Sequence, residues 1–363
     1  MSILVAMTSA VPTTAPTTAA ATAAAAAEAV TQQHLLIAAG MLAWSLAIAF
    51  LLGTFRRGSV SGDTRLRPGT KPVSVFLVVI GGFVVWFGLQ IAYMSVRAIE
   101  HRQSGAEVQF SAAALRPADF GFLSTVPYIA GLLALMAGDF LARRSLPREL
   151  GWSIDRLPKG VAIGALAMVS VMPLMSGASI ALEWLYQSVG FRHPTEHELL
   201  TVLGKSSDPL TTALIIGGAT LLAPVFEEFL FRGHVQTILA RVFTPRPRLA
   251  AFPVITPESP AVVAAEPALV SLPGASLEMP PPLPPPELPA IVIPPPSARW
   301  AAIATTSVLF SVLHPGWTWP LIFLLALALG YAYERTANLW VPVTMHLIFN
   351  TLQTSLFLYM RSL

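Results

Sequence analysis

The chain contains no cysteine and few charged residues. Without cysteine there is no disulfide, no thiolate metal site and no cysteine nucleophile. Charged residues make up 11% of the 363 positions and hydrophobic residues 54%, whereas a soluble domain carries about 25% charged residues. The composition therefore predicts an all-α, multi-pass helical bundle in the cell membrane.

Several familiar patterns are missing as well. The sequence has no Gly-x-Ser-x-Gly elbow, no P-loop and no His-Glu-x-x-His, which excludes the usual local signatures of serine hydrolases, nucleotide-binding loops and zincins. It shows neither a strand pattern nor an internal repeat, and we expect no nucleic acid partner.

Hydrophobic stretches close to the ~20 residues that cross a hydrocarbon core predict about eight transmembrane helices. They cover approximately residues 35–54, 73–96, 122–141, 161–186, 209–243, 300–313, 317–333 and 339–359. The fifth stretch is longer than a straight crossing needs. It contains Pro224, which predicts a kink or a division into two helical pieces.

Two segments differ in composition from the predicted spans. Residues 1–33 are rich in Ala, Thr and Pro and are expected to be disordered. Residues 244–298 form an insert with seventeen prolines between Pro245 and Pro296. A disordered spacer is the favoured interpretation of this insert, and binding of a proline-recognising partner is the alternative. The predicted helices accordingly form two blocks, 34–243 with helices one to five and 299–363 with helices six to eight.

Positively charged residues give the expected orientation. Lys and Arg concentrate in the connections after the first, third and fifth predicted spans. Because such an excess marks cytoplasmic loops, we expect both termini outside the cytoplasm and the proline-rich insert inside it.

The first polar motif lies inside the fifth apolar stretch. Glu227, Glu228 and Arg232 interrupt the run Ala223–Gly233, and ionisable groups at membrane depth are kept when they pair or do chemistry. On a helix Glu228 and Arg232 are four residues apart and share a face, so they can pair. Glu227 points elsewhere and needs a partner from another helix. The alternative is a charged loop at the membrane surface.

Two further motifs are predicted at a similar depth. Phe310 and His314 end the sixth predicted span, and His346 and Asn350 share a face of the eighth. Each has a simpler interpretation: His314 as a helix-end residue, His346 and Asn350 as a hydrogen bond between helices, and Phe310 as packing. The coincidence of a carboxylate, two imidazoles and an amide in one layer favours a functional site.

This set of groups supports two chemistries. Glu227 with a neutral histidine can take a proton from water, while histidine and asparagine donors stabilise an oxyanion, which together hydrolyse an amide. Alternatively Glu227, His314 and His346 could hold zinc with a water in the open position. The residues alone do not decide between them.

In this order, Glu227-Glu-x-x-x-Arg232, Phe310-x-x-x-His314 and His346-x-x-x-Asn350 resemble the three motifs of the CAAX-protease and bacteriocin-processing (CPBP, formerly Abi) intramembrane endopeptidases. The likeness runs from about residue 146 to 350 without the insert, which separates the first two motifs more than is usual in the family.

The resemblance implies roles for these residues and a substrate class. Glu227 would activate water with the help of His314, and His346 and Asn350 would bind the oxyanion. Glu228 and Arg232 would support the site. The substrate would be a peptide or a membrane-anchored protein, as in CAAX processing or peptide immunity. Family members do not settle whether a metal is needed, so zinc stays open.

Two other classes of function remain open from the sequence. A proton-coupled transporter would use the same intramembrane Glu and His residues as a relay, and an inactive relative would act as a scaffold. An adaptor would act through the proline-rich insert, in which case deleting the insert would abolish its function while a protease would keep its site.

Overall fold

The computed structural model describes residues 18–51, 72–103, 115–143, 150–193, 202–204, 206–244 and 294–362. Within these ranges the chain is helical and forms no strand, so the predicted all-α class is confirmed. The long helices are α1 (Thr18–Leu51), α2 (Pro72–Gln103), α3 (Pro117–Arg143), α4 (Leu157–Ser188), α9 (Pro296–Val312), α10 (Trp319–Thr336) and α11 (Trp340–Ser362). Short 3₁₀ turns precede α4 at Ile154–Arg156 (η3) and α10 at Gly316–Thr318 (η6).

Six helical segments are long and apolar enough to cross a membrane, judged by length and composition within the described residues. They comprise Thr31–Phe50, Val75–Gln103, Pro117–Leu141, Ile154–Ser188, Pro209–Val242 and Gly316–Thr336. The multi-pass membrane architecture is thereby supported, whereas the count of eight is not confirmed. Helix α9 has only 17 residues, and α11 is diluted by polar groups that include His346 and Asn350.

The first helix begins earlier than the sequence pattern predicts. We expected an unstructured tract up to residue 33, but α1 already starts at Thr18. Its first half is dominated by alanine, the residue with the highest intrinsic helix propensity, and this outweighs the low complexity. Residues 1–17 and most of the proline-rich insert lie outside the described residues. The last insert residues, from Pro296, form the first turn of α9 with proline near its N-terminus.

A single helical run, Pro209–Val242, passes through the middle of the protein. It consists of α6 (Pro209–Gly217), η4 (Gly218–Leu222), α7 (Ala223–Glu228), η5 (Phe229–Gln236) and α8 (Thr237–Val242). Asp208 caps the start of the run by accepting the Thr211 N–H, and this hydrogen bonding holds the pKa of Asp208 below its ordinary value.

Pro224 does not divide this run into two helices. Instead the backbone changes from α-helical to π-helical in η4, which ends immediately before Ala223 and Pro224, and again in η5. A proline ring clashes with the carbonyl four residues earlier in a regular α-helix. A π-helical turn shifts the hydrogen-bond register by one residue and is often found at functional sites.

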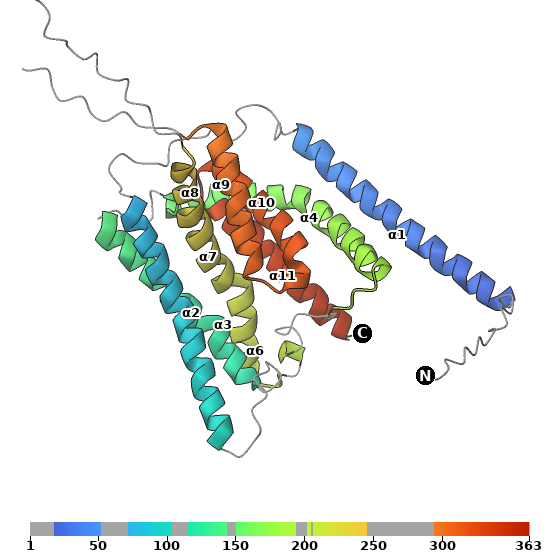
Figure 1. Ribbon diagram of the computed structural model, residues 1–363, viewed down its shortest axis with the longest axis horizontal. Helices are drawn as coiled ribbons and strands as arrows, with labels where there is room; N and C mark the ends of the chain where they lie inside the picture. The colour runs from blue at the N-terminus through green and yellow to red at the C-terminus, as the bar shows by residue number, and fades with distance from the viewer. Residues whose placement is uncertain are drawn as a thin grey trace, which may run out of the picture.

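The helices run back and forth between two ends of the bundle (Figure 1). At one end the connection before α4 meets the connection between α10 and α11. There Arg156 Nη1 donates to the Ala337 carbonyl at 3.0 Å, and Tyr333 Oη donates to the Leu150 carbonyl at 3.1 Å. At the other end Tyr186, late in α4, donates to the Trp317 carbonyl at 2.7 Å. Helix α1 packs along α4 at the periphery (Figure 1).

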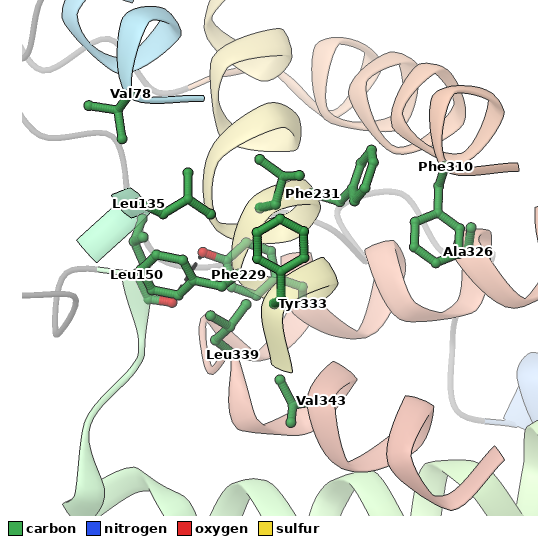
Figure 2. Close-up of a cluster of buried hydrophobic side chains, with 12 residues drawn as sticks. Val78, Leu135, Leu150, Phe229, Phe231, Phe310, Ala326, Tyr333, Leu339 and Val343 are labelled. Atoms are coloured by element: carbon green, nitrogen blue, oxygen red, sulfur yellow. Dashed lines mark hydrogen bonds between the residues drawn. The ribbon is translucent and has the colours of Figure 1, made fainter. Parts of the chain in front are cut away.

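The main hydrophobic core surrounds the central run. Phe226, Phe229, Leu230 and Phe231 contribute side chains that are at most 6% exposed. Figure 2 shows the neighbours that enclose them, which come from α2, α3, α9, α10, the connection before α11, and α11 itself: Val78, Leu135, Phe310, Ala326, Tyr333, Leu339 and Val343. The run that carries Glu227 and Glu228 is therefore the element on which α2, α3, α9, α10 and α11 pack.

Candidate functional site

Glu228 is fully buried and contacts two of the predicted site residues. Its Oε1 lies 3.0 Å from Arg232 Nη1 and 2.9 Å from His346 Nδ1. Arg232 is buried as well, donates to the Ala326 carbonyl at 3.2 Å, and places its guanidinium 4.6 Å from the ring centre of Phe310. The pair that the four-residue spacing predicts between Glu228 and Arg232 is present.

Glu227 lies on the other side of the same histidine. Its Oε2 is 3.8 Å from His346 Nε2, and its side chain is 15% exposed. The imidazole of His346 is thus placed between two adjacent carboxylates, with Glu228 at one ring nitrogen and Glu227 at the other. The partner that Glu227 was expected to find on another helix is His346 of α11.

His314 reaches the cluster through Phe310. Its Nδ1 is 2.9 Å from the Phe310 carbonyl, and the two rings are 4.8 Å apart. Phe310 also lies edge-on to His346, with ring centres 5.8 Å apart. Phe310 therefore lies against both histidines and Arg232, as a packed ring at the centre of the site.

Asn350 is anchored to the central run at a different level. Its Nδ2 donates to the carbonyl of Ala219 at 2.8 Å. Through His346 and Asn350, α11 is therefore bonded to the run on both sides of Pro224: to Ala219 before it and to Glu228 after it.

The zinc interpretation was tested against this arrangement. Among the described residues, no group of three or more His, Asp or Glu side chains is close enough together to hold a metal ion. Both histidines bond through Nδ1, to Phe310 and to Glu228, so Nε2 is the nitrogen through which each would bind a metal. The residues do not form a ready-made zinc site in this conformation.

Sequence reasoning missed a second buried pair beside the site. His234, two residues after Arg232, is fully buried. Its Nε2 is 3.2 Å from Asp139 Oδ1 on α3, and its Nδ1 is 2.8 Å from the Phe229 carbonyl. An aspartate inside the third apolar span was the signal, since an acid at that depth needs a partner.

A third buried polar group lies where the central run, α9 and α10 meet. Glu334 of α10 accepts from Gln236 Nε2 at 3.1 Å and from Arg299 Nη1 at 3.3 Å. Arg299 in turn donates from Nε to the Pro294 carbonyl at 3.1 Å. All three side chains are buried. This network joins the end of the central run, the start of α9 and the end of α10.

The fold and this cluster define a multi-pass helical membrane protein with a buried site of carboxylate, imidazole and amide groups. Residues 290–352 match the family model described as Type II CAAX prenyl endopeptidase Rce1-like, and this match is consistent with the family that the three motifs resemble. The match contains Phe310, His314, His346 and Asn350, while the first motif lies before it. Neither a curated protein nor a solved structure matches the chain.

Proposed function

We propose that the protein is an intramembrane endopeptidase that hydrolyses a peptide bond with water activated by Glu227. The observation that carries the proposal is the position of His346 between Glu227 and Glu228, at 3.8 and 2.9 Å. The Rce1-like match over the second and third motifs supports the same class of enzyme. A carboxylate and an imidazole that share a buried site are the groups that general acid–base hydrolysis needs.

Hydrogen bonding assigns the protons on the two histidines. A carbonyl oxygen only accepts, so His314 donates from Nδ1 to Phe310, and its Nε2 carries the lone pair while the ring is neutral. His346 likewise donates from Nδ1 to the Glu228 carboxylate. Glu228, which is held by Arg232, thereby fixes the orientation of the His346 ring, as the aspartate does for the histidine of a catalytic triad.

The reaction then proceeds in two proton transfers. Glu227 takes a proton from water, and the hydroxide adds to the scissile carbonyl, while the lone pair of His314 Nε2 assists in orienting the water. The oxyanion accepts from the second N–H of Asn350 and from His346 Nε2, which donates only when the ring is doubly protonated. Return of the proton from Glu227 to the amine completes cleavage of the C–N bond. No step in this scheme passes through a metal.

The substrates proposed are peptides or membrane-anchored proteins cut close to an end, with CAAX-type prenylated sequences first among them because of the family match. Processing of small peptides for immunity stays as the alternative substrate. Both need a lipid-embedded site, which the multi-pass fold provides.

The test is a proteolysis assay on the purified full-length protein with quenched-fluorescent peptides, one farnesylated on a CAAX cysteine and one unmodified. Glu227→Gln and His346→Ala are expected to lower kcat by at least about 100-fold, as the loss of acid–base catalysis does. The matched control is Glu100→Gln, which removes an exposed carboxylate at the end of α2 and should leave kcat unchanged.

Full activity in Glu227→Gln or His346→Ala would remove the catalytic assignment. No cleavage by the folded parent protein, together with proton-coupled uptake into vesicles that depends on Glu227, would favour the transporter instead. Metal analysis and treatment with a chelator complete the design: loss of activity that zinc restores would replace water activation by Glu227 with metal-assisted hydrolysis.

A further inference from the structure

The bond between Asn350 and Ala219 depends on an irregular hydrogen-bond register in the central run. In a regular α-helix the Ala219 carbonyl would accept from the N–H of Ala223. Here the Ala223 N–H donates to Gly218 instead, five residues back, because η4 is π-helical. In the π-helical register the carbonyl of Ala219 would accept from the N–H of residue 224. Residue 224 is proline, which has no backbone N–H.

In the π-helical register the carbonyl of Ala219 is therefore left without a donor from its own helix. It accepts the Asn350 amide at 2.8 Å. Backbone carbonyls that are shielded from water are nearly always paired, since leaving one unpaired costs free energy. Pro224 thus creates an acceptor at one position of the helix, and Asn350 of α11 satisfies it.

This acceptor also determines how the Asn350 amide is turned. Because a carbonyl cannot donate, Nδ2 and not Oδ1 must face Ala219. One N–H of Asn350 is then fixed on Ala219, and the planar amide sets the direction of the second N–H. An oxyanion donor must be held in place before the reaction to be effective.

We propose that Pro224 is a positioning residue that orients Asn350 by freeing the Ala219 carbonyl. The proposal rests on the proposed function, because it takes Asn350 as an oxyanion donor. The packing around η4 supports it: a Cβ at Gly218 would overlap the Ser124 carbonyl of α3, so the π-helical turn is held against a neighbouring backbone and cannot readily shift.

The experiment is a double-mutant cycle on the full-length protein, assayed with the farnesylated quenched peptide. Pro224→Ala returns an N–H to position 224, which competes with Asn350 for Ala219. We expect kcat to fall by about tenfold with KM within about twofold, since misplacement of a transition-state donor acts on kcat. Asn350→Ala should cost about 100-fold, and adding Pro224→Ala to it should cost nothing more.

The matched control is Pro173→Ala, which returns an N–H within α4, a helix that carries none of the site residues, and should leave kcat unchanged. Wild-type kcat in Pro224→Ala would overturn the proposal. It would also be overturned if Pro224→Ala lowered kcat by the same factor in the wild-type protein and in Asn350→Ala. Neither result would touch the proposed function, which falls only if Glu227→Gln or His346→Ala keeps its activity.

A second measurement covers the case in which Pro224→Ala does not fold. Asn350→Leu leaves the Ala219 carbonyl without a donor, whereas Thr125→Val removes a buried hydroxyl bond to a helical carbonyl, that of Gly121, four residues back on α3. Asn350→Leu should lower Tm by several degrees more than Thr125→Val. An equal or smaller decrease would mean that Ala219 has another donor, and the proposal would fail.

Discussion

Glu227 and Glu228 are adjacent in sequence and have different surroundings. Glu228 is fully buried, faces a buried Arg232 at 3.0 Å and holds His346, whereas Glu227 is partly exposed and 3.8 Å from the other nitrogen of that histidine. The first carboxylate is therefore tied into the structure, and the second is available to a water or a substrate.

This difference predicts that replacing glutamate by glutamine lowers stability at position 228 and lowers activity at position 227. Glu228→Gln removes the charge that compensates Arg232 and should lower the free energy of unfolding by about 3–5 kcal/mol, the cost of leaving a buried charge unpaired. Glu227→Gln should leave stability nearly unchanged while abolishing cleavage. Thermal unfolding of both variants in one detergent is the measurement, and equal Tm values would contradict the assignment.

At the residue scale the sequence was informative where spacing along one helix decides a contact. Four-residue spacing predicts the pair of Glu228 with Arg232 and the shared face of His346 and Asn350. Contacts between helices could not be predicted from the sequence. The approach of His346 to both carboxylates depends on how α11 crosses the central run. His234 was missed because its partner, Asp139, is remote in sequence and is brought close only by the packing of α3.

At the element scale the central run is the irregular one. One of its π-helical turns, η4, ends two residues before Pro224, and the other, η5, carries Arg232. Hydropathy predicts this helix within a residue or two, and proline predicts that it is irregular. It does not predict the kind of irregularity, because a kink, a break and a π-helical turn all relieve the same clash, and the neighbouring α3 backbone selects among them.

Two successive glycines provide a matched test of that close packing. A Cβ at Gly218 would overlap the Ser124 carbonyl, whereas a Cβ at Gly217 meets nothing within 4 Å. Gly218→Ala should therefore destabilise the protein by about 1–3 kcal/mol through overpacking. Gly217→Ala should be neutral or stabilise it by up to about 1 kcal/mol, since alanine favours a helix. Equal unfolding temperatures for the two variants would show that α3 does not press on η4.

At the scale of the whole molecule the helices define two ends, and their orientation across the membrane stays a prediction. The end near Glu334 and Arg299 is expected in the cytoplasm, and the end near Tyr186 and Trp317 outside, because the basic connections lie at the first. The number of crossings stays open in the same way. Helix α9 is short, with 17 residues, and α11 carries His346 and Asn350, polar residues that lower the hydropathy by which a span is recognised.

The absence of cysteine makes this orientation directly measurable. Ser188→Cys and Arg335→Cys place single thiols at exposed positions near opposite ends of the bundle. In intact cells an impermeant maleimide is expected to label position 188 and to reach position 335 only after the membrane is opened. The reverse labelling pattern would show that the protein has the opposite orientation in the membrane. Labelling of both positions in intact cells would mean that the two ends face the same side.

The buried network of Gln236, Glu334 and Arg299 separates the catalytic framework from the segment between residues 244 and 294. It fastens the chain on both sides of that segment to α10. In general, doubling the length of a connection costs only about 0.6 kcal/mol of closure entropy, so we expect the length of the segment to have little effect on the packing of the helices. An insertion at this position is therefore expected to leave the packing of the helices unchanged, so a tether or a targeting signal can be added there.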